Sequence, residues 1–278
     1  MSSVASPRSA GGNGRDSGHS LAARLLDSKA VLRLGTLAII AAIWQTYAVT
    51  VGGLLIPTFD GTIFALGELL IDVEFWRAVW VSNQSLFLGF AIAVAGGIPL
   101  GLMMGRYRPA EQFTDVYINI MLVTPMAALI PILIMSLGFG LTSRVILVVL
   151  FAIPMVIVNS RAGVRQVDPS LIEMAGSFGA NEGQIWRRIL LPGSLPSIMT
   201  GIRIGLGRAI TAMVIIELLM IAVGLGGLII NFRGAFNPEG LYAVVIFVVL
   251  EALFLISVVR WVEARLVPWA RAGVLASE

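Results

Sequence analysis

Six apolar stretches, each about as long as a helix that crosses a lipid bilayer, constrain this chain most. The hydrocarbon layer is about 30 Å thick, and a helix needs about 20 residues to cross it. The stretches run from Leu34 to Val51, Ser85 to Met104, Val116 to Leu137, Val145 to Asn159, Ile198 to Val223 and Tyr242 to Val262. They are continuous and lack the alternation of barrel strands. The sequence therefore predicts an all-α, polytopic membrane protein with about six transmembrane helices.

The composition agrees with a lipid environment and excludes several kinds of site. Hydrophobic residues make up 58% of the chain and charged residues 13%, against about 25% charged in soluble domains. Cysteine is absent, and His19 and Lys29 are the only residues of their types. Disulfides, thiolate metal sites, a cysteine nucleophile and a G-x-x-x-x-G-K-[ST] phosphate loop are therefore excluded. If ATP drives this protein, another chain binds it.

The basic residues predict the orientation, because lysine and arginine collect in cytoplasmic loops. With the N-terminus inside, the outer segments hold only Arg77, Arg144 and Arg233. The cytoplasmic segments hold Arg8, Arg15, Arg24, Lys29, Arg33, Arg106, Arg108, Arg161, Arg165, Arg187, Arg188, Arg260, Arg265 and Arg271. Both termini are expected to be cytoplasmic. The basic residues are spread between apolar segments, so they give no indication of nucleic-acid binding.

The chain divides into three parts by composition. Residues 1–30 are expected to form a disordered cytoplasmic tail, 31–266 the transmembrane domain, and 267–278 a cytoplasmic tail. Between the first two spans, Ile63 to Val79 mixes apolar and acidic residues at helical spacing, which predicts a helix along the outer surface. Prolines within the third and fourth spans predict kinks, through packing irregularity or a moving gate.

The polar interval at residues 160–197 is too long to be a simple connection. Asp168 and Pro169 predict the start of a helix, as its N-cap and first residue. Gly179 predicts its end. A second helix is expected from Glu182 to Leu190, closed by prolines at 192 and 196. Two short amphipathic helices joined at a glycine predict a compact cytoplasmic projection.

This interval resembles the EAA loop of ABC importer permeases, whose pattern is E-A-A-x3-G-x9-I-x-L-P. The matching residues are Glu173, Met174, Ala175, Gly179, Ile189, Leu191 and Pro192, with Met174 the one departure from the pattern. The resemblance implies that Glu173, Ala175 and Gly179 form a surface that docks on the ATPase subunit. It also implies that Ile189, Leu191 and Pro192 tie the loop to the fifth span.

The resemblance extends over roughly residues 55 to 265 and points to the nitrate, sulfonate and taurine branch. The segments that carry it are Leu55–Pro57, Gly97–Leu102, Pro125–Gly140, Gly201–Arg203 and Glu217–Gly227. It implies a type I importer fold in the bacterial inner membrane and a small, often anionic solute. The implied partners are two ATPase subunits that use ATP and Mg²⁺, a second permease copy, and a periplasmic or lipid-anchored binding protein.

Three charged residues lie within the predicted fifth span. Glu217 is flanked by apolar residues, and a charge near the bilayer centre costs about 2.5 to 3.5 kcal/mol on insertion scales. It is therefore expected to face protein or water, either in a translocation pathway or as a hydrogen-bonded packing residue. Arg203 and Arg208 either line an inner vestibule that attracts anions or extend to the interface. Glu251 in the sixth span has a similar position.

Two other classes of protein are less consistent with these features. An ion-coupled secondary transporter would show internal repeats and several buried ionisable groups. A membrane enzyme would need a catalytic constellation, and the spans hold no histidine, cysteine or lysine. The chain is expected to perform no covalent chemistry itself and to have no catalytic or metal-binding residues.

Overall fold

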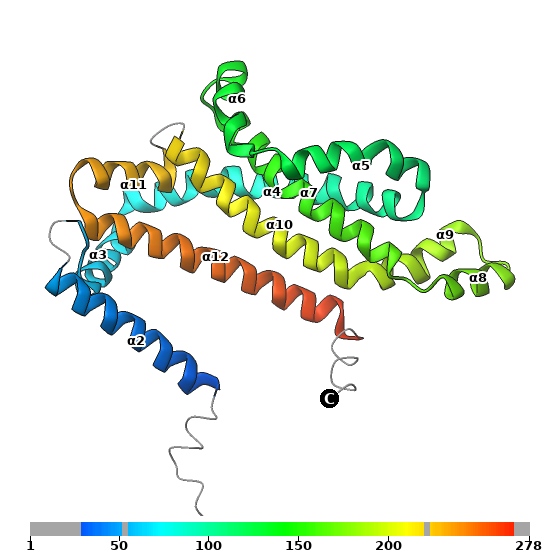
Figure 1. Ribbon diagram of the computed structural model, residues 1–278, viewed down its shortest axis with the longest axis horizontal. Helices are drawn as coiled ribbons and strands as arrows, with labels where there is room; N and C mark the ends of the chain where they lie inside the picture. The colour runs from blue at the N-terminus through cyan, green and yellow to red at the C-terminus, as the bar shows by residue number, and fades with distance from the viewer. Residues whose placement is uncertain (1–28, 52–54, 220–222, 270–278) are drawn as a thin grey trace, which may run out of the picture. The chain divides into compact units, whose positions relative to one another are not determined.

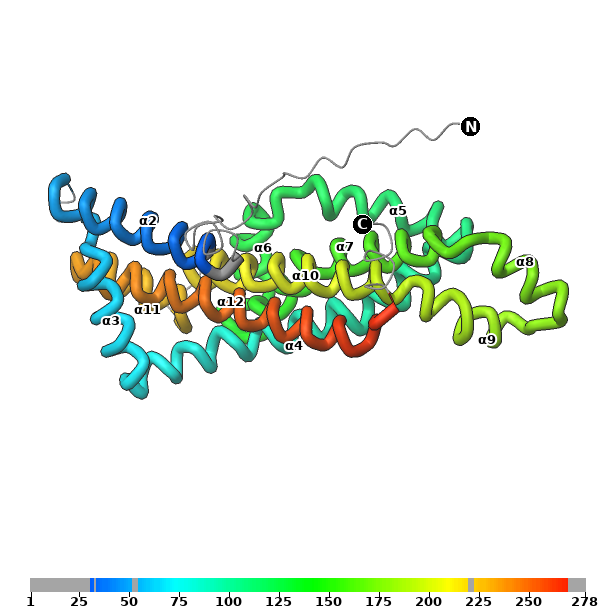
Figure 2. The backbone as a smooth tube through the Cα atoms, turned by 90° about the horizontal axis from the view of Figure 1, so that it is seen from below, coloured from blue at the N-terminus to red at the C-terminus, as the bar shows by residue number. Residues whose placement is uncertain are grey.

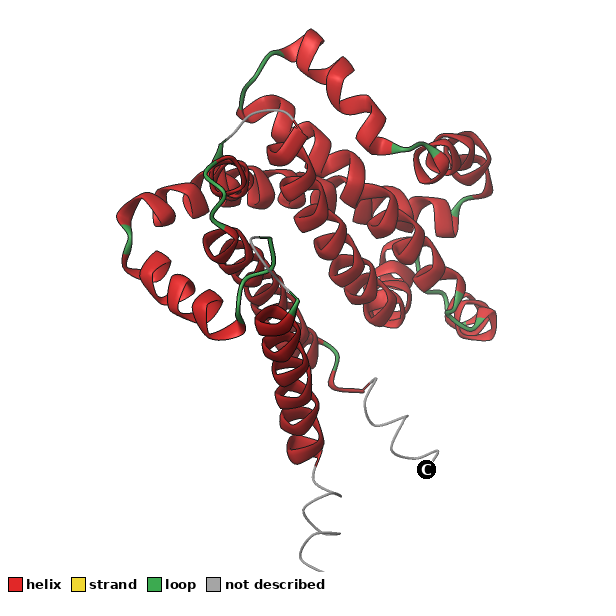
Figure 3. Cartoon of the chain, turned by 60° about the vertical axis from the view of Figure 1, so that its left-hand side comes forward, coloured by secondary structure: helices red, strands yellow, loops and turns green. Residues whose placement is uncertain are grey.

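The computed structural model describes residues 29–51, 55–219 and 223–269, so the two predicted tails lie almost entirely outside it. All regular elements in these ranges are helices (Figure 3), which confirms the all-α prediction. In chain order they are α2 (Lys29–Thr50), α3 (Phe59–Ile71), α4 (Val73–Arg106), α5 (Arg108–Val123), the 3-10 helix η1 (Met126–Leu129), α6 (Ile130–Leu137), α7 (Leu141–Arg165), α8 (Pro169–Ser177), α9 (Glu182–Ile185), the π-helical segment η2 (Trp186–Leu190), α10 (Leu191–Leu219), α11 (Gly224–Gly234) and α12 (Pro238–Leu266).

The chain divides into two compact units, residues 1–60 and 61–278. In the first unit, the turn that follows α2 folds back onto the end of that helix. The Trp44 indole N–H donates to the Pro57 carbonyl at 2.9 Å, and the Gln45 side-chain oxygen accepts the Phe59 backbone N–H at 2.7 Å. The rings of Trp44 and Phe59 meet edge to face, with centroids 5.6 Å apart. These contacts fix the path of the chain into α3.

In the second unit, α7 packs against both α4 and α10, while α11 and α12 flank this core (Figures 1 and 2). The apolar centre includes the fully buried side chains of Leu86, Leu147 and Met213, one from each of the three core helices. On α12 the side chains of Leu253 and Phe254 are exposed, as expected for a helix that faces lipid.

A stripe of small residues lets α4 and α7 approach closely. It consists of Gly89, Ala93, Gly97, Gly101 and Gly105, one residue in every four, so all lie on one face of α4. A Cβ atom at Gly101 would lie 2.5 Å from the Ile157 carbonyl oxygen and 2.7 Å from the Ser160 Cβ. In lipid, such close van der Waals contact replaces the hydrophobic effect as the force that joins helices.

Gly201 and Gly205 serve the same purpose on α10. A Cβ atom at Gly201 would lie 2.8 Å from the Asn159 Cβ, and one at Gly205 would lie 3.0 Å from Val156 Cγ2. Both neighbours belong to α7. Glycines of α4 therefore pack on one side of α7, and glycines of α10 pack on another.

By length and apolar composition together, three of the described helices can cross the membrane alone, α4, α7 and α12, or up to five spans if each of two bent pairs counts as one. The predicted third span, Val116 to Leu137, is wrong as a single helix, because the chain bends by 90° between α5 and residues 126–137. Pro125 accounts for the bend, since it lacks an N–H and drives Thr124 to an extended conformation.

Other predicted boundaries also shift. The outer-surface helix predicted from Ile63 to Val79 is broken at Asp72, whose carboxylate caps α4 by accepting the Glu74 N–H at 2.9 Å. Its second half therefore belongs to α4, which continues into the second span. The predicted fifth span begins earlier, at Leu191, and its described part ends at Leu219.

The glycine stripe predicts a steep dependence of stability on side-chain size. Gly101→Val should lower the thermal unfolding midpoint of the purified protein, because the added atoms would meet the α7 backbone, at a cost of about 1–3 kcal/mol. Gly96→Val is the matched control, since Gly96 is exposed and its Cβ would meet nothing closer than 3.8 Å. Equal midpoints for the two variants would contradict this packing.

Candidate functional site

Two short helices project beyond the ends of α7 and α10 (Figures 1 and 2). We call residues 168–190, which hold α8, α9 and η2, the knob. It lies inside the predicted interval at residues 160–197, which also contains the last turn of α7 and the first turns of α10. The knob carries five of the seven residues of the predicted loop motif, and the other two, Leu191 and Pro192, follow directly after it.

The knob begins and turns where local signals predicted. The Asp168 carboxylate accepts the Ser170 backbone N–H at 2.9 Å, and this bond holds the pKa of Asp168 below its ordinary value. Gly179 has φ +78°, a conformation that side chains other than glycine rarely adopt. Asn181 and Gln184 then exchange side-chain and backbone hydrogen bonds at 2.9 Å, forming a capping box that starts α9.

The prolines at the end of the knob do not close it, contrary to the prediction. The Leu191 N–H donates to the Trp186 carbonyl, five residues back, and the helix then runs on through Pro192 and Pro196 into α10. A π-helical turn of this kind absorbs one extra residue without ending a helix. The second arm of the knob, α9 with η2, is consequently continuous with α10, as one helical rod from Glu182 to Leu219.

The inner face of the knob is apolar and packed. Ile172, Ala175 and Ile189 contact a cluster that includes the buried side chains of Leu102 on α4 and Val164 on α7. Arg106, at the end of α4, adds an ion pair with Glu182 at 2.6 Å. The orientation of the knob is therefore set by the long helices beneath it.

The outer face of the knob is also partly apolar, and this feature was missed from the sequence. Leu171, Met174 and Phe178 are exposed, and Phe178 exposes 85% of its surface. Their spacing of three and four residues is a usable signal for one face of a helix. Glu173 and Gly179 are exposed beside this row.

A pocket of about 380 Å³ lies between the arms of the knob. It is lined by Phe178, Gly179, Arg188 and Ile189, among others. Arg187 and Arg188 are exposed next to it. The outer face can thus offer an apolar row to a groove in a partner, with two cations beside that row.

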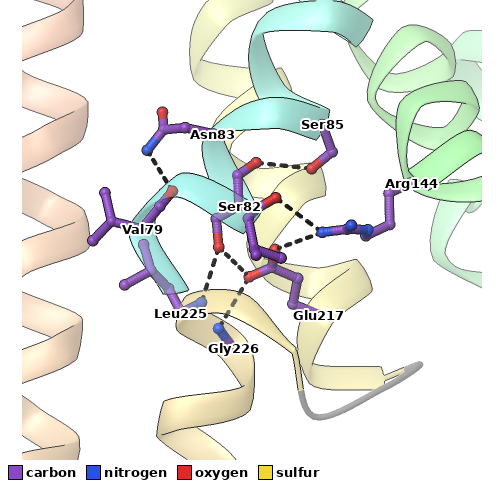
Figure 4. Close-up of polar contacts among 9 residues, drawn as sticks. Val79, Ser82, Asn83, Ser85, Arg144, Glu217, Leu225 and Gly226 are labelled. Carbon is purple, nitrogen blue, oxygen red and sulfur yellow. Dashed lines mark hydrogen bonds and ion pairs between the residues drawn. The ribbon is translucent and has the colours of Figure 1, made fainter. Parts of the chain in front are cut away.

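The charged residues of the fifth span do not form one cluster. Glu217 is buried, and its carboxylate accepts hydrogen bonds from Ser82 and from the backbone of Gly226 (Figure 4). Arg203 pairs with Glu263 of α12 at 2.8 Å. Arg208 is exposed, one turn further along α10. Their assignment to a translocation pathway stays a prediction.

The described residues contain no group of three or more histidine, aspartate or glutamate side chains placed to hold a metal ion. Glu251, the second acid within a span, accepts the Asn83 side-chain N–H and so links α12 to α4.

The turn at Gly179 generates a prediction for the knob. Gly179→Ala would force alanine into the left-handed region at a cost of about 1–2 kcal/mol. Trypsin should then cleave after Arg187 and Arg188 several-fold faster in membrane vesicles. Gly176→Ala is the control, because this glycine is helical and its Cβ would meet nothing within 4 Å. Equal cleavage rates in both variants would show that the turn at Gly179 does not keep the two arms of the knob folded.

Comparison with known proteins places these features in a family. Residues 97–271 match the family model described as the binding-protein-dependent transport system inner membrane component. The taurine transport system permease protein TauC of Escherichia coli is 30% identical over 88% of this chain and 91% of its own length. A putative aliphatic sulfonates transport permease protein, SsuC of Bacillus subtilis, is 29% identical over 84% of this chain and 85% of its own length.

A solved structure supports the same fold. A chain of the MetNI methionine ABC transporter, in an inward-facing conformation, superimposes with a TM-score of 0.57 at 22% identity, covering 70% of this chain and 94% of its own. The knob, the helical core and the family match thus agree: the chain belongs to the binding-protein-dependent inner-membrane components, the permease subunits of ABC importers.

Proposed function

We propose that this chain forms the translocation pathway for a small anionic solute of the sulfonate or taurine type. A binding protein delivers the solute, and a separate ATPase drives its import through the knob. The single observation that carries the coupling role is the exposed row Leu171, Met174 and Phe178, on a projection that the long helices hold firmly. A water-exposed apolar row of this kind is typical of a docking helix that fits a groove.

The chemistry of ATP belongs to the partner in this proposal. The chain has no phosphate-binding loop and a single lysine, Lys29. Two ATPase subunits would bind ATP and Mg²⁺, close on each other and carry the docked knobs with them. Since α9 and η2 of the knob form one helical rod with α10, such a movement would tilt α10.

Orientation and assembly follow the same reasoning. Arg161, Arg165, Arg187 and Arg188 lie in the knob or at the adjoining end of α7, whereas Arg144 lies at the other end of α7. Under the positive-inside rule, this distribution supports a cytoplasmic knob, with both termini on the same side. We propose a homodimer of this permease in the bacterial inner membrane, with the periplasmic or lipid-anchored binding protein on the opposite face.

The docking proposal predicts which side chains hold the ATPase. Affinity purification of the tagged permease from its host should recover an ATPase subunit with the wild type. Phe178→Ala and Glu173→Arg should lower that recovery about tenfold or more, because exposed aromatic anchors contribute at least about 2 kcal/mol at interfaces. Glu68→Arg, a matched reversal of an exposed glutamate on α3, should leave the recovery unchanged.

Two results would contradict the docking proposal. Full recovery of the ATPase with both knob variants would place the contact elsewhere. Absence of any ATPase from the wild type, in a detergent that keeps membrane complexes intact, would favour the alternative of an ion-coupled secondary transporter.

The anionic class of the solute rests on two observations. The matched relatives TauC and SsuC are named for taurine and aliphatic sulfonates. Arg208 presents an exposed guanidinium on a face of α10 that also exposes Ile204 and Thr211, whereas the charge of Arg203 is paired with Glu263. A cation that lines a pathway raises the local concentration of anions.

This difference between the two arginines predicts their effects on transport. Arg208→Gln should raise the KM for an anionic solute about three- to tenfold with little change in the thermal midpoint. Arg203→Gln should mainly lower the midpoint, because it leaves Glu263 without its partner. The measurement is initial-rate uptake of a labelled alkanesulfonate, which carries a net negative charge, at several ionic strengths. Unchanged KM in Arg208→Gln would remove this residue from the pathway.

A further inference from the structure

A buried polar cluster joins four helices (Figure 4), at the end of the core that holds α11 and lies opposite the knob (Figure 1). Its centre is Glu217, near the end of α10, with no exposed side-chain surface. One carboxylate oxygen, Oε2, accepts the Ser82 hydroxyl of α4 at 2.7 Å and the Gly226 N–H of α11 at 3.0 Å. Ser82 in turn accepts the Leu225 N–H at 2.9 Å. The cluster therefore holds the first turn of α11.

The fourth helix contributes a cation. The Arg144 guanidinium of α7 lies 3.6 Å from Glu217 Oε1 and donates to the Val81 carbonyl of α4 at 3.0 Å. A buried carboxylate in lipid requires hydrogen bonds and a counter-charge. Glu217 finds both, and its partners come from three other helices.

The start of α11 lies so close to this carboxylate that two positions there have no room for a side chain. Gly224 has φ +63°, and a Cβ there would lie 2.6 Å from Glu217 Oε1. A Cβ at Gly226 would lie 2.8 Å from the backbone carbon of Glu217. Side chains at either position would push α11 away from α10. The close approach of α11 to α10 therefore depends on glycine at both positions, and it brings the Gly226 N–H within hydrogen-bond distance of Glu217.

We infer that Glu217 is a positioning residue that clasps α11 to α4, α7 and α10, so that movement of the knob reaches the opposite end of the core. The movement of the knob rests on the proposed function, whereas the attachment of α11 by Glu217 does not depend on it. The Glu217 side chain has no exposed surface in this chain, and its hydrogen bonds reach the first turn of α11, so we assign it a role through the position of α11. The 29 residues of α10 span about 44 Å between the knob and the clasp.

Hydrogen–deuterium exchange of the purified full-length chain tests the clasp without any partner. Glu217→Ala should speed exchange of the α11 amides about tenfold or more, because a charged acceptor of two hydrogen bonds is lost. Exchange in α8, at the knob, should not change. Glu239→Gln, at an exposed glutamate of α12, is the control. Unchanged exchange in α11 would overturn the inference whatever the partner proves to be.

Milder variants keep the test valid if Glu217→Ala does not fold. Ser82→Ala removes two hydrogen bonds, the one donated to Glu217 and the one accepted from the Leu225 N–H, and should speed α11 exchange about two- to tenfold. Adding Arg144→Met to Glu217→Gln should recover part of the loss, since removing both charges leaves none unpaired. Equal exchange in wild type, Ser82→Ala and Glu217→Gln would exclude the clasp.

The role in coupling is tested in the complex with its ATPase. Glu217→Gln should retain ATP hydrolysis within about twofold while the solute transported per ATP falls at least about fivefold. An unchanged amount of solute transported per ATP would contradict the role in coupling, whether both rates stay normal or fall together. Failure of the wild type to bind an ATPase would instead reject the proposed function and leave the exchange result standing.

Discussion

The close contact between α4 and α7 determines where the rest of the second unit can lie. Gly97 and Gly101 on α4 leave no room for side chains, so the α7 backbone approaches where a larger residue would clash. Gly201 and Gly205 bring α10 onto another side of α7. In lipid no hydrophobic force drives helices together, and contact of this kind supplies the stability. The knob and the Glu217 clasp are both attached to this three-helix core.

The two ends of the core differ in chemistry. At one end α7 and α10 extend into the knob, whose inner face is packed and whose outer row of Leu171, Met174 and Phe178 is open to a partner. At the other end Glu217 is enclosed among helices, and it bonds with Ser82, Gly226 and the largely buried Arg144. A helical rod between a docking surface and a clasp suits a subunit that converts a partner's movement into a change at the far side of a membrane.

Local signals predicted the helical fold and the construction of the knob. Asp168 and Gly179 act within a few residues, through a cap and a positive φ, so the sequence alone located them. Phe178 was missed because two apolar stripes run along α8, and only packing decides which is covered. Glu217 was recognised as buried and in need of a partner, but Ser82 is 135 residues away, and no local pattern identifies it. Pro192 was misread because a π-helical turn carries the helix past it.

The most direct test of the account is uptake by proteoliposomes that hold the permease with its ATPase. Labelled taurine and the binding protein are supplied outside, and ATP with Mg²⁺ is enclosed. The account predicts accumulation of taurine inside only when ATP is present, and loss of that accumulation with Phe178→Ala. Uptake that needs no ATP and follows an imposed proton or sodium gradient would contradict it and identify a secondary transporter.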